Sequence, residues 1–388
     1  DSGVNATGST YVAYLFASDA GGFGDDGDEN IIKCGSVTTD GSGKASVDLG
    51  FEPQWCLWKC VDAAGGNEHG NWRINDTMRG WPAPSSANAF GYPSTLYANT
   101  SGAETINGVD GFIKSATGFG FGQVQANKTY IYIAIRRPMK TPESGTEVFA
   151  PVLGVTAGAT TTGFPVDYTI ARNPSAGQQN FAFTRMLGET YLATQVTNAE
   201  SATGIGNQFD VQNGIKLSDW FGVSSTVISW NFKRATGFMD VVVSTATQTL
   251  VNPATEHTLG VVPEFIISKT RNNTANWFVY HSALGLTQYL ELSSTNAFQT
   301  YNVFGTTLTS TQFQYYSQTV GESVVNYLFA TLAGVSKVGS YTGTGSDLNV
   351  DCGFSAGARF ILIKRTDSTG GWHVWDSSRG ISSNTDPY

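Results

Sequence analysis

The stretch TYIYIAIRR, residues 129–137, contains one of four copies of a strand pattern that recurs along the chain. The copies begin at Tyr11 (YVAYLFAS), Tyr130 (YIYIAIRR), Val227 (VISWNFKR) and Val324 (VVNYLFAT), so their starts lie 119, 97 and 97 residues apart. A strand that is apolar on both faces is typical of the middle of a covered sheet. Its return at a near-constant period indicates tandem modules. We therefore expect an array of similar β-rich units.

A second block occurs four times and always leads into an aromatic segment that ends in glycine. The block reads GFEPQWCLWK from Gly50, GFPVDYTIAR from Gly163, GVVPEFIISK from Gly260 and GFSAGARFILIK from Gly353. Within it an aromatic, an aliphatic and a cationic residue alternate on one strand face. The first two predict core positions, and the cation is expected to lay its stem over apolar surface with its charge at the edge. The cations are Lys59, Arg172, Lys269 and Lys364.

Further short strands follow in each whole module, among them STLYANTSGAE from Ser94 and ATGFGFGQ from Ala116. Modules of about 100 residues with at least five short strands predict an all-β fold of tandem β-sandwiches, most naturally jelly rolls. The expected boundaries are 1–20 for the last strand of a preceding module plus a linker, 31–140 for module 1 with a long loop insertion, 146–236 for module 2, 237–332 for module 3 and 333–388 for the first part of module 4. The chain is expected to be a segment of a longer polypeptide.

The composition narrows the possible partners. Charged residues make up only 14% of the chain and the net charge is −9, with no basic cluster. Such a chain is a poor candidate for binding nucleic acid, because phosphate neutralisation supplies most of that affinity. No apolar run has the length of a membrane span. A neutral, hydroxyl-rich surface instead fits a particle built from many copies of one chain.

The ordered blocks resemble repeats found in virion proteins of tailed bacteriophages. In that family a glycine-phenylalanine-x-proline start and a "WIK" strand precede an aromatic stretch ending D-x-x-R-G, then a "YL-x-x-N-x-T-x-x-E" strand, an "NGF" strand and a closing "YVAW" strand. Module 1 carries these as GFEPQWCLWK, WRINDTMRG, LYANTSGAE, ATGFGF and TYIYIAIRR. The resemblance covers essentially the whole chain. It implies concanavalin-like or jelly-roll sandwiches in tail fibres, other appendages or virion surface proteins.

The chain departs from this pattern in the D-x-x-R-G motif. Asp76 with Arg79, and Asp376 with Arg379, match it. In modules 2 and 3 the arginine is replaced by leucine, and His281 stands where module 3 would carry the aspartate. A salt bridge or ligand site at this motif therefore cannot be common to all modules.

Exposed aromatic residues are the candidates for contact with carbohydrate or with a partner protein. Trp81, Tyr92 and Tyr97 lie in or beside the loop that makes module 1 longer by 22 residues than the 97-residue spacing. Binding residues are often carried on loops inserted into a rigid scaffold. Trp220 in SDWFG raises the same possibility. The alternative for these tryptophans is a structural contact with a neighbouring module or another subunit.

Catalytic and metal-binding chemistry has little support in the sequence. A glycosidase needs two carboxylates on either side of the scissile bond, and the nearest candidate, Glu291, has no acidic residue two positions away. The four histidines have no metal-ligand spacing. Asp25, Asp26, Asp28 and Glu29 form the one acidic cluster. Its three aspartates are a weak candidate for calcium, with a solvated linker as the preferred interpretation. We expect no enzymatic activity and no cofactor.

The sequence therefore predicts a non-enzymatic structural protein of a tailed-phage virion, a tail fibre or tail appendage. Its expected partners are identical subunits, other virion proteins and host-surface polysaccharide, with no nucleic acid and no membrane insertion. The alternatives are a capsid-decorating or sheath-like lattice protein, a bacterial surface adhesin and, least favoured, a polysaccharide hydrolase.

Overall fold

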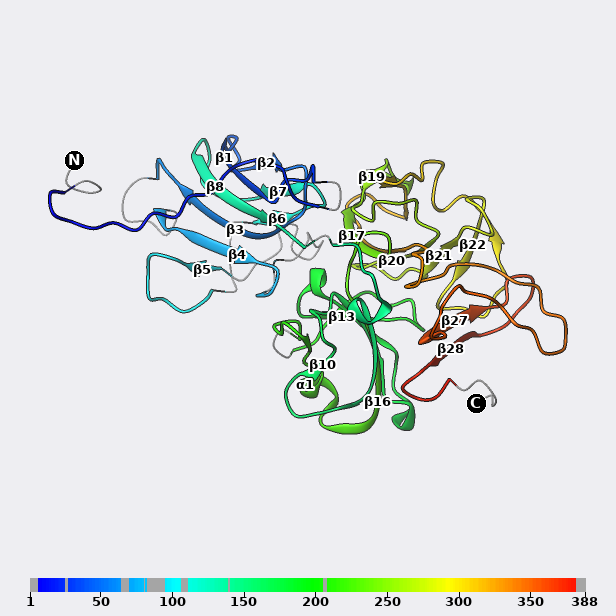
Figure 1. Ribbon diagram of the computed structural model, residues 1–388. Coiled ribbons are helices and arrows are strands. Elements are labelled where there is room, and N and C mark those ends of the chain that lie inside the picture. The colour runs from blue at the N-terminus through cyan, green and yellow to red at the C-terminus, as the bar shows by residue number, and fades with distance from the viewer. Residues whose placement is uncertain are drawn as a thin grey trace.

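The computed structural model describes residues 6–24, 27–63, 70–79, 81, 95–105, 111–138, 140–204 and 208–381. Antiparallel sheets dominate, which confirms the predicted all-β fold of tandem sandwiches (Figure 1). The short helical segments include α1 (Ser218–Phe221) and the 3₁₀ turns η2 (Gly145–Glu147), η3 (Pro174–Ala176) and η4 (Arg185–Leu187). None of the helices described here has the length and apolar character that a bilayer crossing requires.

Module 1 consists of a large and a small antiparallel sheet. The large sheet has the order β1 (Ile32–Thr38), β8 (Thr129–Arg136), β3 (Pro53–Cys60), β4 (Arg73–Asp76) and β5 (Leu96–Tyr97). The small sheet has the order β2 (Ala45–Asp48), β7 (Gly118–Phe121) and β6 (Ile113–Lys114). A cluster of buried aromatic and aliphatic side chains fills the space between them, including Trp58, Phe112 and Phe119.

Modules 2 and 3 repeat this arrangement with one more edge strand each. The large sheet of module 2 runs β9 (Phe149–Val155), β16 (Ser224–Phe232), β11 (Tyr168–Arg172), β12 (Phe181–Thr184), β13 (Thr190–Ala193) and β14 (Ser201–Ala202). That of module 3 runs β17 (Met239–Thr245), β26 (Ser323–Phe329), β20 (Phe265–Thr270), β21 (Phe278–His281), β22 (Gln288–Glu291) and β23 (Gln299–Thr300). Two-stranded pairs make the second layers: β10 (Thr160–Thr161) with β15 (Gly214–Ile215), β18 (Leu250–Val251) with β25 (Tyr316–Ser317), and β19 (Thr255–Glu256) with β24 (Gln312–Phe313).

The strand that carries the recurring pattern and closes each module (β8, β16 and β26) is here called the closing strand. It is central in all three large sheets, as its two apolar faces predicted. It lies between the first strand of the module and the strand of the second block, and the register is the same each time. Ile135 faces Trp55, Phe232 faces Tyr168, and Phe329 faces Phe265. Because a slip of one residue would turn every core side chain outward, this shared register shows that the modules are repeats at the level of individual residues.

In the residues up to 381 that the structure describes, the strands of the fourth segment are a hairpin of β27 (Phe360–Lys364) and β28 (Trp372–Asp376). Residues 337–353 match the part of module 1 that forms β1 and β2, but here they form no strand. The cause is that β1 pairs with the closing strand β8, and β2 pairs with β7. The described part of the fourth segment contains no equivalent of either partner.

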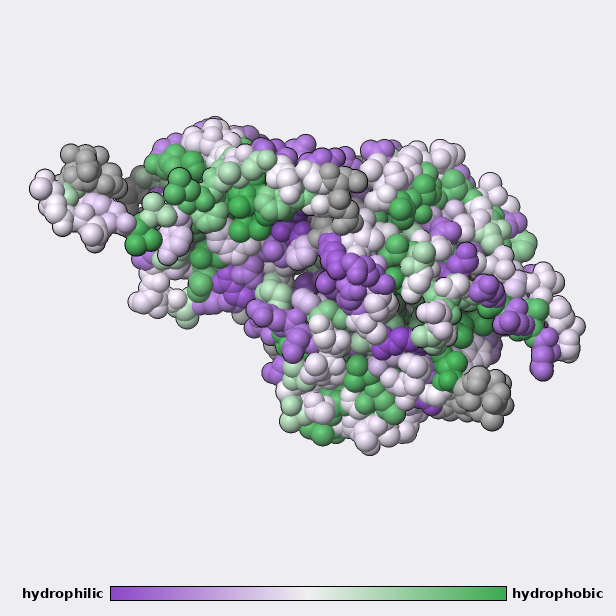
Figure 2. Space-filling view, viewed as in Figure 1, coloured by the Kyte–Doolittle hydropathy of each residue, from purple (hydrophilic) through white to green (hydrophobic). Residues whose placement is uncertain are grey.

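The first copy of the closing-strand pattern does not form the expected covered strand. Residues 11–17 form no strand, although Ser18 exchanges side-chain hydrogen bonds with the Cys34 backbone of β1. Val12, Tyr14 and Leu15 are 82%, 85% and 89% exposed. A lone extended segment has no neighbour to satisfy its backbone groups, so sequence pattern alone cannot hold it in a sheet. The segment extends beyond the body of the molecule at the N-terminal end (Figure 2).

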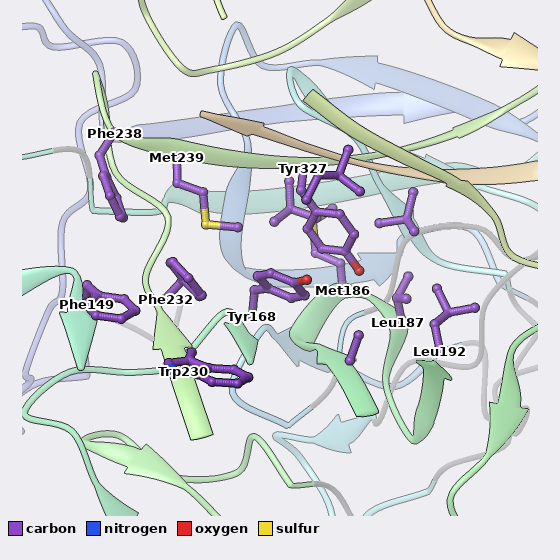
Figure 3. Close-up of a cluster of buried hydrophobic side chains, with 14 of the residues drawn as sticks. Phe149, Tyr168, Met186, Leu187, Leu192, Trp230, Phe232, Phe238, Met239 and Tyr327 are labelled. Carbon is purple, nitrogen blue, oxygen red and sulfur yellow. The ribbon is translucent and has the colours of Figure 1, made fainter. Parts of the chain in front are cut away.

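A shared core joins modules 2, 3 and the β27–β28 hairpin. The outer faces of the large sheets meet there, and Tyr168 and Tyr327 lie with ring centroids 4.2 Å apart (Figure 3). The hydroxyls of Thr184 and Tyr327 form a hydrogen bond of 2.7 Å across the same boundary. Burial of each large apolar side chain contributes about 1.5–3 kcal/mol, so these modules are expected to move as one body.

Candidate functional site

Trp81 is a core residue, which corrects the expectation that its ring contacts a sugar or a partner. Its side chain is 1% exposed and stacks on Phe112 with centroids 4.8 Å apart and planes 10° apart. The indole N–H donates to the Phe112 carbonyl oxygen at 3.2 Å. With both faces covered and its one donor satisfied, the ring fills module 1.

Tyr97, the other described candidate of the long loop, lies in a strand of the large sheet and not in the core beside Trp81. Tyr97 lies on β5 at the edge of the large sheet, where the Arg73 guanidinium sits 5.6 Å from its ring centre. Arg73 is also 5.0 Å from the Trp58 ring, so it ties Tyr97 to the core. Tyr92 lies outside the described residues.

The acidic cluster forms no metal site in the part that is described. Asp25 and Asp26 lie outside the described residues, and Glu29 forms an ion pair of 3.3 Å with Arg136. Across the described ranges, no three His, Cys, Asp or Glu side chains are grouped so that they could hold a metal ion. Glu291, the carboxylate considered for hydrolysis, accepts a hydrogen bond from the Asn276 side chain and is buried near β28.

Trp220 differs from Trp81 because its ring is partly exposed beside a surface recess. The single turn α1 places the ring against Phe181 and Tyr191, with centroids 5.2 and 4.9 Å away. Gly222 then ends the turn with a φ of 69°, which favours glycine. The recess of about 370 Å³ is lined by Gly177, Gln178, Gln179, Phe181 and Trp220.

The chemistry of this recess suits a sugar better than a charged ligand. Gln178 and Gln179 are exposed, and their amides carry both donors and acceptors for hydroxyl groups. An aromatic ring beside them offers an apolar face on which the C–H face of a pyranose can stack. The hairpin turn that carries the glutamines is shaped by η3, where the Asn173 side chain accepts a hydrogen bond from the Ser175 backbone N–H.

A buried ion network at the junction of modules 1, 2 and 3 was missed by the sequence analysis. Glu52 of module 1 pairs with Arg234 of module 2 at 2.5 Å, and Arg234 pairs with Asp240 of module 3 at 2.7 Å. Lys114 and Arg137 complete the network at 2.8 and 3.3 Å from Glu52. One available signal was the charge of Glu52 between Phe51 and Pro53, at the start of a strand with buried positions.

The cations determine the protonation of this junction. Burial alone would raise the pKa of Glu52, but Arg234 and Lys114 hold it well below its usual range. Burial opposes the ionised form of Asp240 as well, and Arg234 with Arg137 lowers the pKa of that carboxyl. Because each buried charge is matched by a partner, the network fixes one relative orientation of the three modules.

The contacts between modules 2 and 3 recur between module 3 and the fourth segment. The indole N–H of Trp277 donates to the Ala193 oxygen at 3.1 Å, and that of Trp372 donates to the Glu291 oxygen at 2.9 Å. These donors and acceptors occupy equivalent positions in their modules. The repeated tryptophans therefore attach module 3 to module 2 and the fourth segment to module 3.

The recurring cations of the second block make the same kind of contact. Lys269 donates to the Thr197 oxygen at 3.1 Å, and Lys364 donates to the Thr295 oxygen at 3.2 Å. Two backbone hydrogen bonds are repeated as well, from Ala275 to Thr197 and Glu200 to Arg271, then from Gly370 to Thr295 and Phe298 to Thr366. These two cations therefore contact the neighbouring module, where edge positions had been predicted.

Comparison with known proteins gives a family without an established activity. The family model described as "Domain of unknown function (DUF7483)" matches residues 153–387. No curated protein and no solved structure matches the chain significantly. Since the matched region covers more than half of the sequence, the chain belongs to the DUF7483 family.

Proposed function

We propose that this chain is a non-enzymatic structural protein of a tailed-bacteriophage virion, built into a tail fibre or a tail-attached appendage. The observation that carries the proposal is the repeated interface, in which equivalent tryptophan and lysine side chains attach module 3 to module 2 and the fourth segment to module 3. Because the same interface occurs twice in succession, further modules can be attached to the array in the same way. The ordered motifs that resemble those of phage virion proteins supply the biological setting.

Rigidity supports the same role. The shared core and the buried ion network leave the modules little freedom to rotate. A spacer that transmits force or holds a receptor-binding surface at a distance needs such joints. Many weak contacts along a rigid array add through avidity, without a catalytic centre.

The Trp220 recess favours host-surface glycan as a ligand of module 2. The partly exposed indole and the two exposed glutamine amides are the features of the described surface that carry this part of the proposal. A lattice protein that contacts only its own copies, either decorating a capsid or forming a sheath, is the main alternative. A bacterial surface adhesin would use the same recess but would be attached to a cell.

Immunogold labelling of purified phage particles tests the proposal. An antibody raised against residues 1–388 is expected to label the tail or its appendages, and preincubation with the purified chain should abolish the label. Label confined to the capsid would support the decorating alternative, and label on uninfected cells would support an adhesin. Absence of the chain from particles by mass spectrometry would overturn the virion assignment.

A further inference from the structure

Two of the four copies of the closing-strand pattern end in a basic pair, Arg136 with Arg137 and Lys233 with Arg234. The other two copies end in alanine followed by serine or threonine. Arg234 is buried in the ion network at the junction of modules 1, 2 and 3. Arg136 and Arg137 line a surface pocket of about 370 Å³, here called the junction pocket. The proposed structural role does not explain why basic side chains gather around this pocket.

The junction pocket lies between modules 1 and 3. Module 1 contributes Arg136, Arg137 and Thr117 to its lining, and module 3 contributes Glu256 and Thr311. Pockets that bind small molecules usually have volumes of about 300–1,000 Å³, so the junction pocket is large enough for such a ligand. A ligand held here contacts two modules at once.

Arg136 uses its hydrogen-bonding capacity only in part. Its Nη1 and Nη2 atoms donate to the Asn30 oxygen and to the Glu29 carboxylate, each at 3.3 Å. Its Nε–H is buried and has no hydrogen-bond partner within the described part of the chain. Because a guanidinium carries five N–H donors in a planar fork, Arg136 retains donors for a further acceptor.

The ion network next to the pocket contains more cations than carboxylates. Among the described residues, the cations that surround Glu52 and Asp240 are Lys114, Arg137 and Arg234. Each member has a partner, but three cations face two carboxylates. Arg137 is held loosely, at 3.3 Å from Glu52 and 3.8 Å from Asp240. Since an unbalanced buried charge is unfavourable, an anion beside Arg137 would stabilise the junction.

The neighbouring carboxylates do not remove this surplus. Asp167 pairs with Arg185 at 3.3 Å, and Glu29 pairs with Arg136 at the same distance. Glu256 is exposed at the pocket, where solvent screens its charge. Burial lowers the pKa of Arg136, although Glu29 has the opposite effect. The charges around the pocket therefore favour an anion as its ligand.

We propose that the junction pocket binds a phosphate or sulfate group through Arg136 and Arg137. Arginine suits such oxyanions because its planar fork of donors can contact two oxygens together. The hydroxyls of Thr117 and Thr311 offer two further donors, one from each module. The volume of the pocket admits a group that is free in solution or esterified to a sugar. This inference goes beyond the proposed structural role and does not depend on it.

Binding of the oxyanion should also tighten the attachment of module 1 to module 3. The ligand would neutralise the surplus charge at the junction and would contact side chains of both modules. A ligand that binds only the folded arrangement stabilises it increasingly as the ligand concentration rises. The melting temperature of the chain is therefore expected to rise with the concentration of the oxyanion.

Isothermal titration calorimetry of the 1–388 chain tests the site with inorganic phosphate, sulfate and glucose 1-phosphate, at an ionic strength kept constant with sodium chloride. At least one of the three should bind with a dissociation constant of about 1 mM or below, and unmodified glucose should not bind. Binding of an inorganic ion shows that the oxyanion alone is sufficient. Binding of glucose 1-phosphate alone identifies a phosphorylated sugar as the ligand. If none of the three binds, or if glucose binds equally well, the proposal is wrong.

Two substitutions with opposite expected effects locate the site. Arg136→Gln removes a cation that lines the pocket and should weaken binding about tenfold. Glu256→Gln removes an anion from the same lining and should strengthen binding about two- to fivefold. Arg365→Gln, which removes an exposed cation of the fourth segment, is the matched control and should bind as the parent does.

Circular dichroism in chloride buffer shows whether each variant is folded. Glu256 is exposed, so Glu256→Gln should keep the parent spectrum and melting temperature. An affinity that neither Arg136→Gln nor Glu256→Gln changes would place the ligand elsewhere and overturn the proposal. If Arg136→Gln does not fold, an unchanged affinity of Glu256→Gln is by itself sufficient to overturn it.

Discussion

The indole N–H of Trp230 donates a hydrogen bond of 3.0 Å to the Asp376 carboxylate and so joins module 2 to β28, 146 residues away. The same carboxylate accepts from Arg379 at 2.6 Å, and the Arg379 guanidinium lies 5.3 Å from the centre of the Trp230 ring. The D-x-x-R motif of the fourth segment thus serves as a docking point for another module.

Trp230→Phe should weaken this docking without emptying the core. The phenyl ring keeps most of the apolar contact, but Asp376 loses one donor, and loss of a hydrogen bond to a buried charged group costs about 1–3 kcal/mol. Hydrogen exchange of residues 372–376, followed by mass spectrometry, is expected to accelerate. Trp375→Phe is the control, because its ring stacks on His373 of the same strand. Equal acceleration in both variants would argue that β28 is simply frayed.

Because of Lys269, the free energy of unfolding should change with pH in the alkaline range. Burial lowers the pKa of this amine to about 8, whereas the unfolded chain has the ordinary value near 10.5. The unfolded state therefore binds more protons between these values, and the free energy of unfolding should rise as pH increases from about 8 to 10.5. Urea midpoints measured across this window report the slope.

Lys269→Met removes the titrating group and should flatten that slope. The exposed Lys337 offers a matched control, since Lys337→Met deletes the same charge from an exposed position. If the pH dependence of the free energy of unfolding persists in Lys269→Met but disappears in another variant, a group other than Lys269 causes it. Loss of the Thr197 contact should also loosen module 3 from module 2 at neutral pH.

The sheets could be predicted from the sequence because each strand carries its own pattern of apolar residues. The closing strands β8, β16 and β26 are apolar on both faces, and all three are central. The recurring cations were also visible, but alternation along one strand gives only the face on which Lys269 lies. Its acceptor, the Thr197 oxygen, lies 72 residues away, so the contact depends on how two modules pack.

The residues whose positions were predicted wrongly show which information such sequence patterns lack. Trp81 lies in an insertion with no periodicity, so nothing local indicated that its ring would stack on Phe112. Tyr14 has the pattern of a buried strand, but a strand also needs a neighbour, and no described strand pairs with residues 11–17. Composition and alternation describe a side chain's preference, whereas its burial depends on the rest of the fold.

Glu52→Gln should release module 1 from modules 2 and 3. The amide keeps the size of the side chain but removes the anion that neutralises Arg234 and Lys114, and breaking a buried pair in this way costs about 3–5 kcal/mol. A lower melting temperature and a larger radius of gyration by small-angle X-ray scattering are the expected results. The control is Glu256→Gln, an exposed acid that lines the same surface pocket as Glu52. A variant with unchanged shape and stability would show that apolar packing alone holds the junction.

The ion network around Glu52 should also make the arrangement of the modules sensitive to acidic pH. Because the folded-state pKa of Glu52 is depressed, its contribution is complete above the unfolded value near 4.5 and is lost as pH falls through and below that value. The radius of gyration of the wild-type chain is therefore expected to stay constant down to about pH 4.5. It should then approach that of Glu52→Gln as acid is added. An expansion already complete near neutral pH would point to a histidine.

Trp220→Ala should weaken binding to host-surface polysaccharide while the module stays folded. Removal of the half-exposed ring takes away the stacking face of the recess but leaves Gln178 and Gln179 in place. A loss of about tenfold in affinity corresponds to 1.4 kcal/mol, a reasonable share for one aromatic contact, and glycan arrays or biolayer interferometry with purified polysaccharide would measure it. Tyr301→Ala, which removes a 47% exposed ring from module 3, is the matched control and should bind normally. If both variants bind as the parent does, the recess is not the glycan site, and the adhesive part of the proposed role must lie on another surface.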